Sequence, residues 1–202
     1  MAALFVWEGI NDWRAEVASV QLGAAGLAAS GTQIGVDPLP YRVDYTLGTR
    51  DDFATELLDV TASGTGWQRR LILGRDESGL WSCTVQQEGA APNEAALAPP
   101  GGDMAALHDV LDCDLGFSPL TNTMPVLRHR LHQKPGTVDF RMAWVAVPSL
   151  AVVMDRQKYQ TVRAGAADPA LVRYSSHRFT ADLELDSDGF VLTYPGLARR
   201  VG

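Results

Sequence analysis

The sequence has little cysteine, no long hydrophobic run and no excess of positive charge. Only Cys83 and Cys113 occur among 202 residues, which excludes a disulfide-rich scaffold and favours two thiols in the core. No stretch approaches the roughly 18 apolar residues that a membrane-spanning helix needs, and the first residues lack the basic segment of a signal peptide. We therefore expect a cytoplasmic protein without a membrane span.

Charge and composition narrow the class of protein further. The chain carries 17 Lys and Arg against 24 Asp and Glu, a net charge of −7. This balance argues against a nucleic-acid partner, because phosphate backbones bind basic surfaces. Hydrophobic residues make up 46% of the chain, which is typical of a globular protein with a core.

Motifs of known catalytic and cofactor sites are missing. The sequence contains no G-x-S-x-G, Walker A or C-x-x-C motif and no G-x-G-x-x-G after a strand, so no cofactor is expected. His129 and His132 have the spacing of half a zinc site, which would still need a ligand such as Asp112 or Asp114. A basic helix end is the simpler interpretation, and we expect no metal.

Most of the chain alternates apolar and polar residues, the pattern of half-buried β-strands. The clearest examples are Tyr41–Leu47, Val138–Trp144 and Phe179–Leu185. Further strands are expected at Glu16–Leu22, Gly26–Ile34, Gln68–Leu73, Leu80–Val85, Leu150–Met154, Leu171–Ser175 and Phe190–Tyr194.

Two similar turns separate strand pairs. Asp76 to Gly79 and Asp186 to Gly189 each end in a glycine that is followed by a large apolar residue, which predicts two hairpins. The likeness is a faint internal repeat and indicates two β halves. The Ala-, Pro- and Gly-rich stretch Glu88–Asp103 is interpreted as the loop between them, within a single domain over residues 1–202.

Only one helix is expected, over Thr121–His132. Thr123 is a candidate N-cap, Pro125 suits the first turn, and Met124, Leu127 and Leu131 share one face. The rest of the chain accommodates about 14 to 15 strands. So many strands must curl into a barrel, roll or sandwich, with the helix filling or lining the interior. The expected class is therefore mostly β.

The segment Asp112–Leu131 is the best candidate for a binding site. A turn that leads into a capped helix explains much of it, but its polar residues among apolar ones also resemble a ligand pocket. The candidate ligand-binding residues are Asp114, Asn122, Thr123, Arg128 and His129, with the strand aromatics Tyr45, Trp144 and Tyr194.

Several blocks resemble one known family. DLGFSPLTNTMP (Asp114–Pro125) and DGFVLTYPGL (Asp188–Leu197), in this order and separation, are similar to the bacterial family described as putative glycolipid-binding. The resemblance runs from about Trp7 to Arg200. It implies a spiral β-roll of about fifteen antiparallel strands wrapped around one α-helix, and it implies a glycolipid or another amphipathic small molecule as the partner.

Three functions remain open at this point. The first is a binding protein for such a ligand, in a cavity between the β-roll and the helix. The second is a structural or interaction module without a ligand. The third is a hydrolase-type enzyme that uses Asp112 or Asp114 with a histidine, for which pairing of a carboxylate and a histidine is the geometric requirement.

Overall fold

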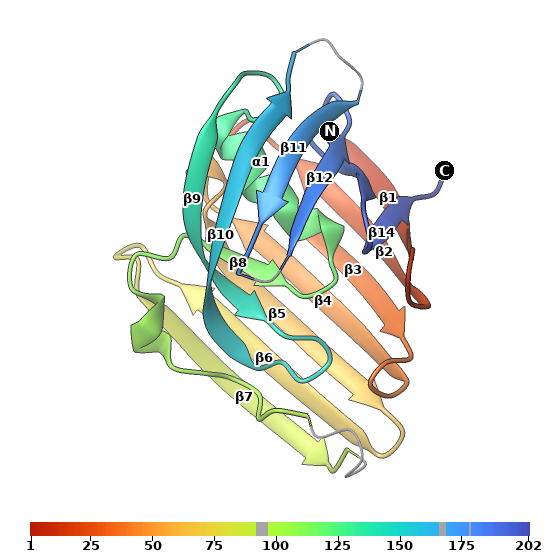
Figure 1. Cartoon of the computed structure of the whole chain (residues 1–202). Coiled ribbons are helices and arrows are strands. Elements are labelled where there is room, and N and C mark those ends of the chain that lie inside the picture. Colours follow the sequence, from red (N-terminus) through yellow and green to blue (C-terminus); the bar gives the residue numbers. More distant parts are fainter. Residues whose placement is uncertain (92–96, 166–168, 178) are drawn as a thin grey trace.

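The described part of the chain folds into one large curled sheet with a single short α-helix. The computed structural model describes residues 1–91, 97–165, 169–177 and 179–202 (Figure 1). The first seven strands are β1 (Ala2–Gly9), β2 (Arg14–Leu22), β3 (Leu27–Gly35), β4 (Tyr41–Thr49), β5 (Thr55–Gly64), β6 (Trp67–Arg75) and β7 (Trp81–Gly89). The other seven are β8 (Asp112–Leu115), β9 (Thr137–Val145), β10 (Val152–Arg163), β11 (Ala170–Ser175), β12 (Thr180–Leu185), β13 (Val191–Tyr194) and β14 (Ala198–Arg200).

The strand order divides the sheet into two meanders. It runs β7-β6-β5-β4-β3-β2-β1-β14-β13-β12-β11-β10-β9-β8, so consecutive strands are neighbours on each side of the β1–β14 junction. All pairs are antiparallel except β8 with β9. The described part of the sheet is open, with β7 and β8 at its edges, and is not closed into a barrel.

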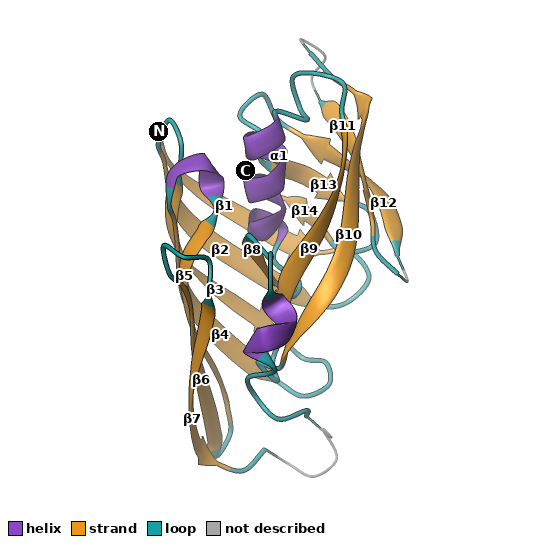
Figure 2. Cartoon of the chain, turned by 90° about the vertical axis from the view of Figure 1, so that its left-hand side faces the viewer, coloured by secondary structure: helices purple, strands orange, loops and turns teal. Residues whose placement is uncertain are grey.

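The sheet curls until its β8 edge lies against its first half. The backbone N–H of Cys113 donates to Oγ1 of Thr55, 2.9 Å away, and the N–H of Thr55 donates to the carbonyl of Leu111 at 3.0 Å. Figure 2 shows the two parts of the sheet facing each other with the helix α1 (Thr123–His129) between them. That the β-roll wraps around this helix stays a prediction.

The helix contributes to two hydrophobic clusters. Met124 belongs to the cluster formed mainly by β1–β8, whereas Val126 packs in a second cluster formed by β9–β13. Both side chains are fully buried. The predicted alternation holds in β4, where Tyr41, Val43, Tyr45 and Leu47 are buried and face the first cluster.

The two predicted hairpin turns have the same structure. Gly79 donates to the carbonyl of Asp76, and Gly189 donates to that of Asp186, both at 3.1 Å. Both glycines have a positive φ, 87° and 85°, which glycine adopts without steric cost. The hairpins β6–β7 and β12–β13 are therefore confirmed.

Other expectations need correction. Asp112–Leu115, for which no strand was expected, forms β8; three of its four residues are buried, so it shows no alternation. The strands β1, β5 and β14 were not expected either. Strand β7 continues to Gly89, into the expected loop, of which residues 92–96 lie outside the described residues.

The helix is shorter than the sequence suggests. A 3₁₀ turn, η4 (Pro119–Asn122), replaces its expected beginning. The N–H of Thr123 bonds to the carbonyl of Leu120 in this turn, and the Thr123 side chain makes no capping bond. The helix ends at Arg130, which adopts a left-handed conformation with φ 54°. No helix among the described residues is long and apolar enough to cross a lipid bilayer.

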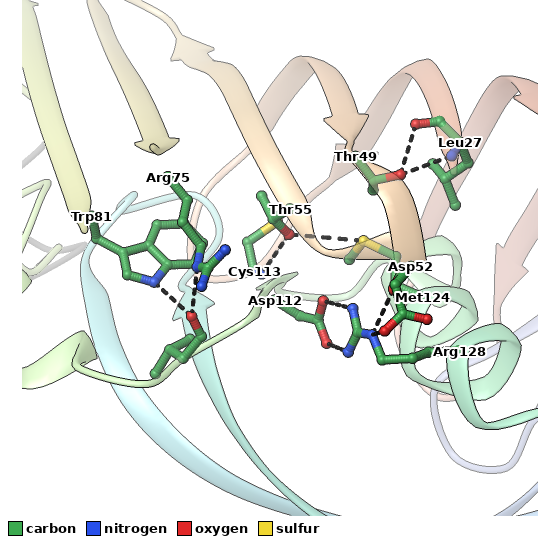
Figure 3. A network of polar contacts seen from close by, with 11 residues as sticks. Leu27, Thr49, Asp52, Thr55, Arg75, Trp81, Asp112, Cys113, Met124 and Arg128 are labelled. Atoms are coloured by element: carbon green, nitrogen blue, oxygen red, sulfur yellow. Dashed lines mark hydrogen bonds and ion pairs between the residues drawn. The ribbon is translucent and has the colours of Figure 1, made fainter. Parts of the chain in front are cut away.

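A buried ion pair holds α1 against β8 (Figure 3). Both terminal nitrogens of the Arg128 guanidinium donate to the carboxylate of Asp112, each over 2.6 Å, and its Nε donates to the carbonyl of Asp52 at 2.7 Å. The two paired side chains are 4% and 0% exposed. A charge left alone at such a site is costly, because little water can reach it.

We expect Arg128→Ala to lower the free energy of unfolding by about 3–5 kcal/mol, because the Asp112 carboxylate would remain buried without its charged partner. Arg173→Ala is the matched control, since Arg173 forms an equally direct pair with Asp182 at the surface and should lose at most about 1 kcal/mol. Urea unfolding of both variants measures this difference. Equal, small losses would contradict the buried pair.

Candidate binding pocket

A pocket of about 270 Å³ opens where the second meander meets the segment before α1. Below it is called the aromatic pocket. Its lining residues come from β8 and the loop after it, η4, β9, β11, the connection between β11 and β12, β13, and the turn between β13 and β14. They are Asp114, Leu115, Gly116, Phe117, Ser118, Asn122, Trp144, Tyr174, Phe179, Tyr194, Gly196 and Leu197. Other hollows, of about 660 and 870 Å³, are larger, but neither combines several aromatic side chains with a polar floor.

The walls are a connected group of aromatic rings. The ring centroids of Tyr174 and Tyr194 are 5.8 Å apart, and those of Phe179 and Tyr194 are 5.9 Å apart. These separations are typical of favourable aromatic pairs. Both tyrosines are buried, whereas Trp144 and Phe179 are 36% and 42% exposed at the opening. The pocket therefore presents aromatic surface from its depth to its mouth.

The floor is polar and hydrogen-bonded. The carboxylate of Asp114 accepts from Oγ1 of Thr121 at 2.7 Å and from Nε2 of Gln157 at 2.6 Å. Beside it, Oδ1 of Asn122 accepts from the hydroxyl of Tyr159 at 2.8 Å. A carboxylate can accept about four hydrogen bonds. Asp114 therefore keeps acceptor capacity for the hydroxyl groups of a ligand.

Asp114 titrates close to neutral pH. Desolvation by the surrounding protein raises the pKa of its carboxyl to about 6, although the hydrogen bonds from Gln157 and Thr121 oppose this rise. The charge of Asp155 adds to the rise. Asp114 is consequently ionised at pH 7 and becomes protonated in mildly acidic solution.

Four of the eight candidate residues from the sequence lie together here: Asp114, Asn122, Trp144 and Tyr194. Thr123 is fully buried at the start of the helix, and its hydroxyl has no partner among the described residues.

The other three candidates lie elsewhere. Arg128 faces Asp112 and borders a different hollow. His129 packs edge-on against Phe140, with ring centroids 5.4 Å apart. Tyr45 points to Glu16. Arg128 is thus paired with Asp112 outside the aromatic pocket.

Sequence reasoning missed the residues that complete the pocket. Phe117 and Ser118 lie inside the block Asp114–Pro125, which predicts the family but does not show that these two side chains line a pocket. Tyr174 pairs with Ala181 in the β11–β12 ladder, so only the register of two strands shows which face it occupies.

The loop over the pocket is tied to the first meander through Glu16. Oγ of Ser118 donates to the Glu16 carboxylate at 2.7 Å, and the hydroxyl of Tyr45 donates to the same oxygen at 2.5 Å. Phe117, with a positive φ of 65°, places its ring 4.1 Å from the guanidinium carbon of Arg14. These contacts hold a strained residue at the mouth of the pocket.

Among the described residues, neither Asp112 nor Asp114 is hydrogen-bonded to a histidine. Asp114 bonds to Thr121 and Gln157 rather than to a histidine, and Nδ1 of the buried His132 has no partner among the described residues. Within the same residues, no group of three or more His, Cys, Asp or Glu side chains is placed to hold a metal ion.

Burial of Glu16 should make stability depend on pH. Burial raises the pKa of its carboxyl from 4.5 to about 7. The unfolded chain therefore releases this proton at lower pH than the folded chain does, and stability falls as pH rises from 4.5 to 7. The loss is on the order of 3 kcal/mol at 1.36 kcal/mol per pKa unit.

Glu16→Gln mimics the protonated carboxyl and should remove this component. We expect the variant and the unaltered protein to unfold at similar urea concentrations at pH 5, and the variant to be the more stable of the two at pH 8. Parallel stability profiles across this range would show that Glu16 titrates normally.

Comparisons with known proteins agree with this architecture. Residues 4–200 match a family described as "Putative glycolipid-binding". A crystal structure of a DUF1089 family protein from Pseudomonas aeruginosa shares 25% sequence identity over 92% of both chains, with a TM-score of 0.67. No curated protein matches the chain. Since the family match spans nearly the whole sequence, the chain belongs to the family described in these words, as the sequence blocks around Asp114 and Tyr194 predict.

Proposed function

We propose that this protein binds an amphipathic molecule of the glycolipid type and that the sugar-like headgroup occupies the aromatic pocket. The observation that carries the proposal is the combination of Trp144 and Tyr194 on the walls with Asp114 and Asn122 on the floor. A sugar ring has C–H faces that pack on aromatic rings and a rim of hydroxyls that needs acceptors and donors. The pocket offers both.

The size of the pocket supports a headgroup rather than a whole lipid. A volume of 270 Å³ corresponds to about nine water-sized groups of about 30 Å³ each. This is slightly below the range of common ligand pockets, which begins at about 300 Å³. One sugar ring is of the right size.

A module without a ligand is the second candidate. It is favoured by the packing of α1, because Met124 and Leu131 are 0% and 1% exposed and a ligand-filled lumen would leave such residues with open space beside them. The binding experiment below separates the two functions.

We expect octyl glucoside, titrated calorimetrically below its micelle concentration, to bind more tightly than an octyl ether detergent that has no sugar. Trp144→Ala should weaken this binding roughly 3- to 10-fold, the value of one aromatic contact. Trp13→Ala is the matched control, since Trp13 is exposed and does not line the pocket. Equal binding of the two detergents, or no binding of either, would favour the module without a ligand.

Binding should also depend on the protonation of Asp114. If ligand hydroxyls donate to the ionised carboxylate, affinity falls as pH drops through about 6, the pKa of this group. Asp114→Asn should bind about 10- to 100-fold more weakly at pH 7.5, the value of a hydrogen bond to a charged group, and should show little change between pH 5 and 7.5. An unaltered pH profile in this variant would remove Asp114 from the site.

A further inference from the structure

We propose that the protein recognises its ligand at a lipid–water interface, while the lipid tail stays in the membrane. A group of exposed apolar residues at the mouth of the aromatic pocket and on the elements next to it, here the collar, would rest on the uncharged surface of the bilayer. It consists of Ile10, Trp13, Phe117, Trp144, Val153 and Phe179. This inference rests on the proposed function and adds the physical state in which the ligand is met.

The first argument is the place of the lipid tail. The pocket of 270 Å³ is filled by one headgroup, and its floor is closed by Asn122 and Tyr159, which are 4% and 0% exposed. Behind the floor, Leu183 and Val126 are fully buried in the second hydrophobic cluster. A tail must therefore leave through the mouth. Each methylene then moved from a bilayer into water would weaken binding about fourfold, so the tail is best left in the bilayer.

The second argument is what surrounds the mouth. Phe117, Trp144 and Phe179 line the pocket and are 37%, 36% and 42% exposed. Val153, 50% exposed, pairs with Trp144 in the β9–β10 ladder, and paired residues share one face of a sheet. The collar thus continues from the pocket onto the neighbouring strand.

The β1–β2 hairpin extends the collar on the other side. The N–H of Ile10 donates to the carbonyl of the pocket residue Leu197 at 3.1 Å. Trp13 follows at the tip of this hairpin and is 63% exposed. It directly precedes Arg14, whose guanidinium contacts the ring of Phe117. The loop that carries Ile10 and Trp13 therefore lies next to the opening, on the side of the first meander.

The third argument concerns charge. Arg14 forms an ion pair with Asp12 at 2.6 Å. Its positive charge is therefore already neutralised and is not available to an anionic lipid. The whole chain carries a net charge of −7, which opposes approach to an anionic bilayer. Tryptophan and phenylalanine, in contrast, favour the interface of a membrane with water. The surface that fits the collar is consequently neutral or zwitterionic and bears a neutral glycolipid.

Vesicle flotation tests the proposal. Phosphatidylcholine vesicles with and without monoglucosyl diacylglycerol are mixed with the full chain, and bound protein and released lipid are measured. We expect binding only to the vesicles that contain glycolipid, with no glycolipid left in the protein fraction after the vesicles are removed. Soluble complexes of protein and glycolipid would overturn the proposal in favour of a carrier that extracts its ligand.

The variant Trp13→Ser/Val153→Ser separates the collar from the pocket. We expect at least a tenfold loss of vesicle binding, while binding of octyl glucoside in solution is unchanged. Leu80→Ser is the matched control, since Leu80 is 68% exposed on the hairpin between β6 and β7, outside the collar, and should keep both activities. Circular dichroism checks that the variants are folded.

The remaining outcomes are also decisive. If octyl glucoside binds but vesicles do not, the collar is wrong and the proposed function stands. If neither binds, both proposals fail. If the unaltered protein has the mass of two chains by light scattering and the collar variant that of one, the collar covers a second copy of the chain, and the membrane proposal is overturned.

Discussion

The pairing of β1 with β14 is the constraint on which the rest of the structure depends. Trp7 and Gly9 lie opposite Arg200 and Ala198 across this junction, and the indole nitrogen of the buried Trp7 donates to the carbonyl of Val191 at 2.9 Å. Without the β1–β14 pairing there would be two separate seven-stranded meanders, each with an apolar face in water. With it, the backbone hydrogen bonds continue across fourteen strands, and curling of the sheet buries both faces against each other.

The curl then decides where polar groups are buried. Asp112 and Glu16 lie at places where the two meanders meet, and each is satisfied by a partner from a distant part of the sequence: Arg128 for Asp112, and Ser118 and Tyr45 for Glu16. Buried groups of this kind contribute specificity, because any other arrangement leaves a charge or a donor unpaired. They also fix the loop that carries Phe117, and therefore the mouth of the pocket.

The pocket combines features that a core alone would not need. Asp114 is held by two hydrogen bonds, yet it lines an opening, and the rings of Trp144 and Phe179 remain partly exposed beside it. A purely structural site would pack these rings against other side chains. This arrangement supports the proposed binding of a sugar-like headgroup, and the volume of the pocket supports the proposal that the tail of the ligand stays outside.

Much of the architecture could be predicted from local patterns. Alternation identified strands such as β4 and β9, the Asp-to-Gly turns identified two hairpins, and two sequence blocks identified the family. The patterns did not predict a strand that is buried on both faces, nor the 3₁₀ turn that precedes the α-helix. Strand β8 has no alternation, since both of its faces are covered, and the 3₁₀ turn before α1 has the same composition as a helix start.

The sequence by itself determined the β class, the single helix and the segment in which the pocket lies, because period-two patterning and turn residues act over a few positions. Only the tertiary structure decided that Arg128 forms an ion pair with Asp112 and that Tyr45 donates a hydrogen bond to Glu16. It also decided that Tyr174 and Phe179 line the same pocket as Asp114. These neighbours are set by strand register and by the curl of the whole sheet. A register shift of one residue would turn every side chain of a strand to the opposite face, and no local pattern encodes the partner that a strand meets after the curl.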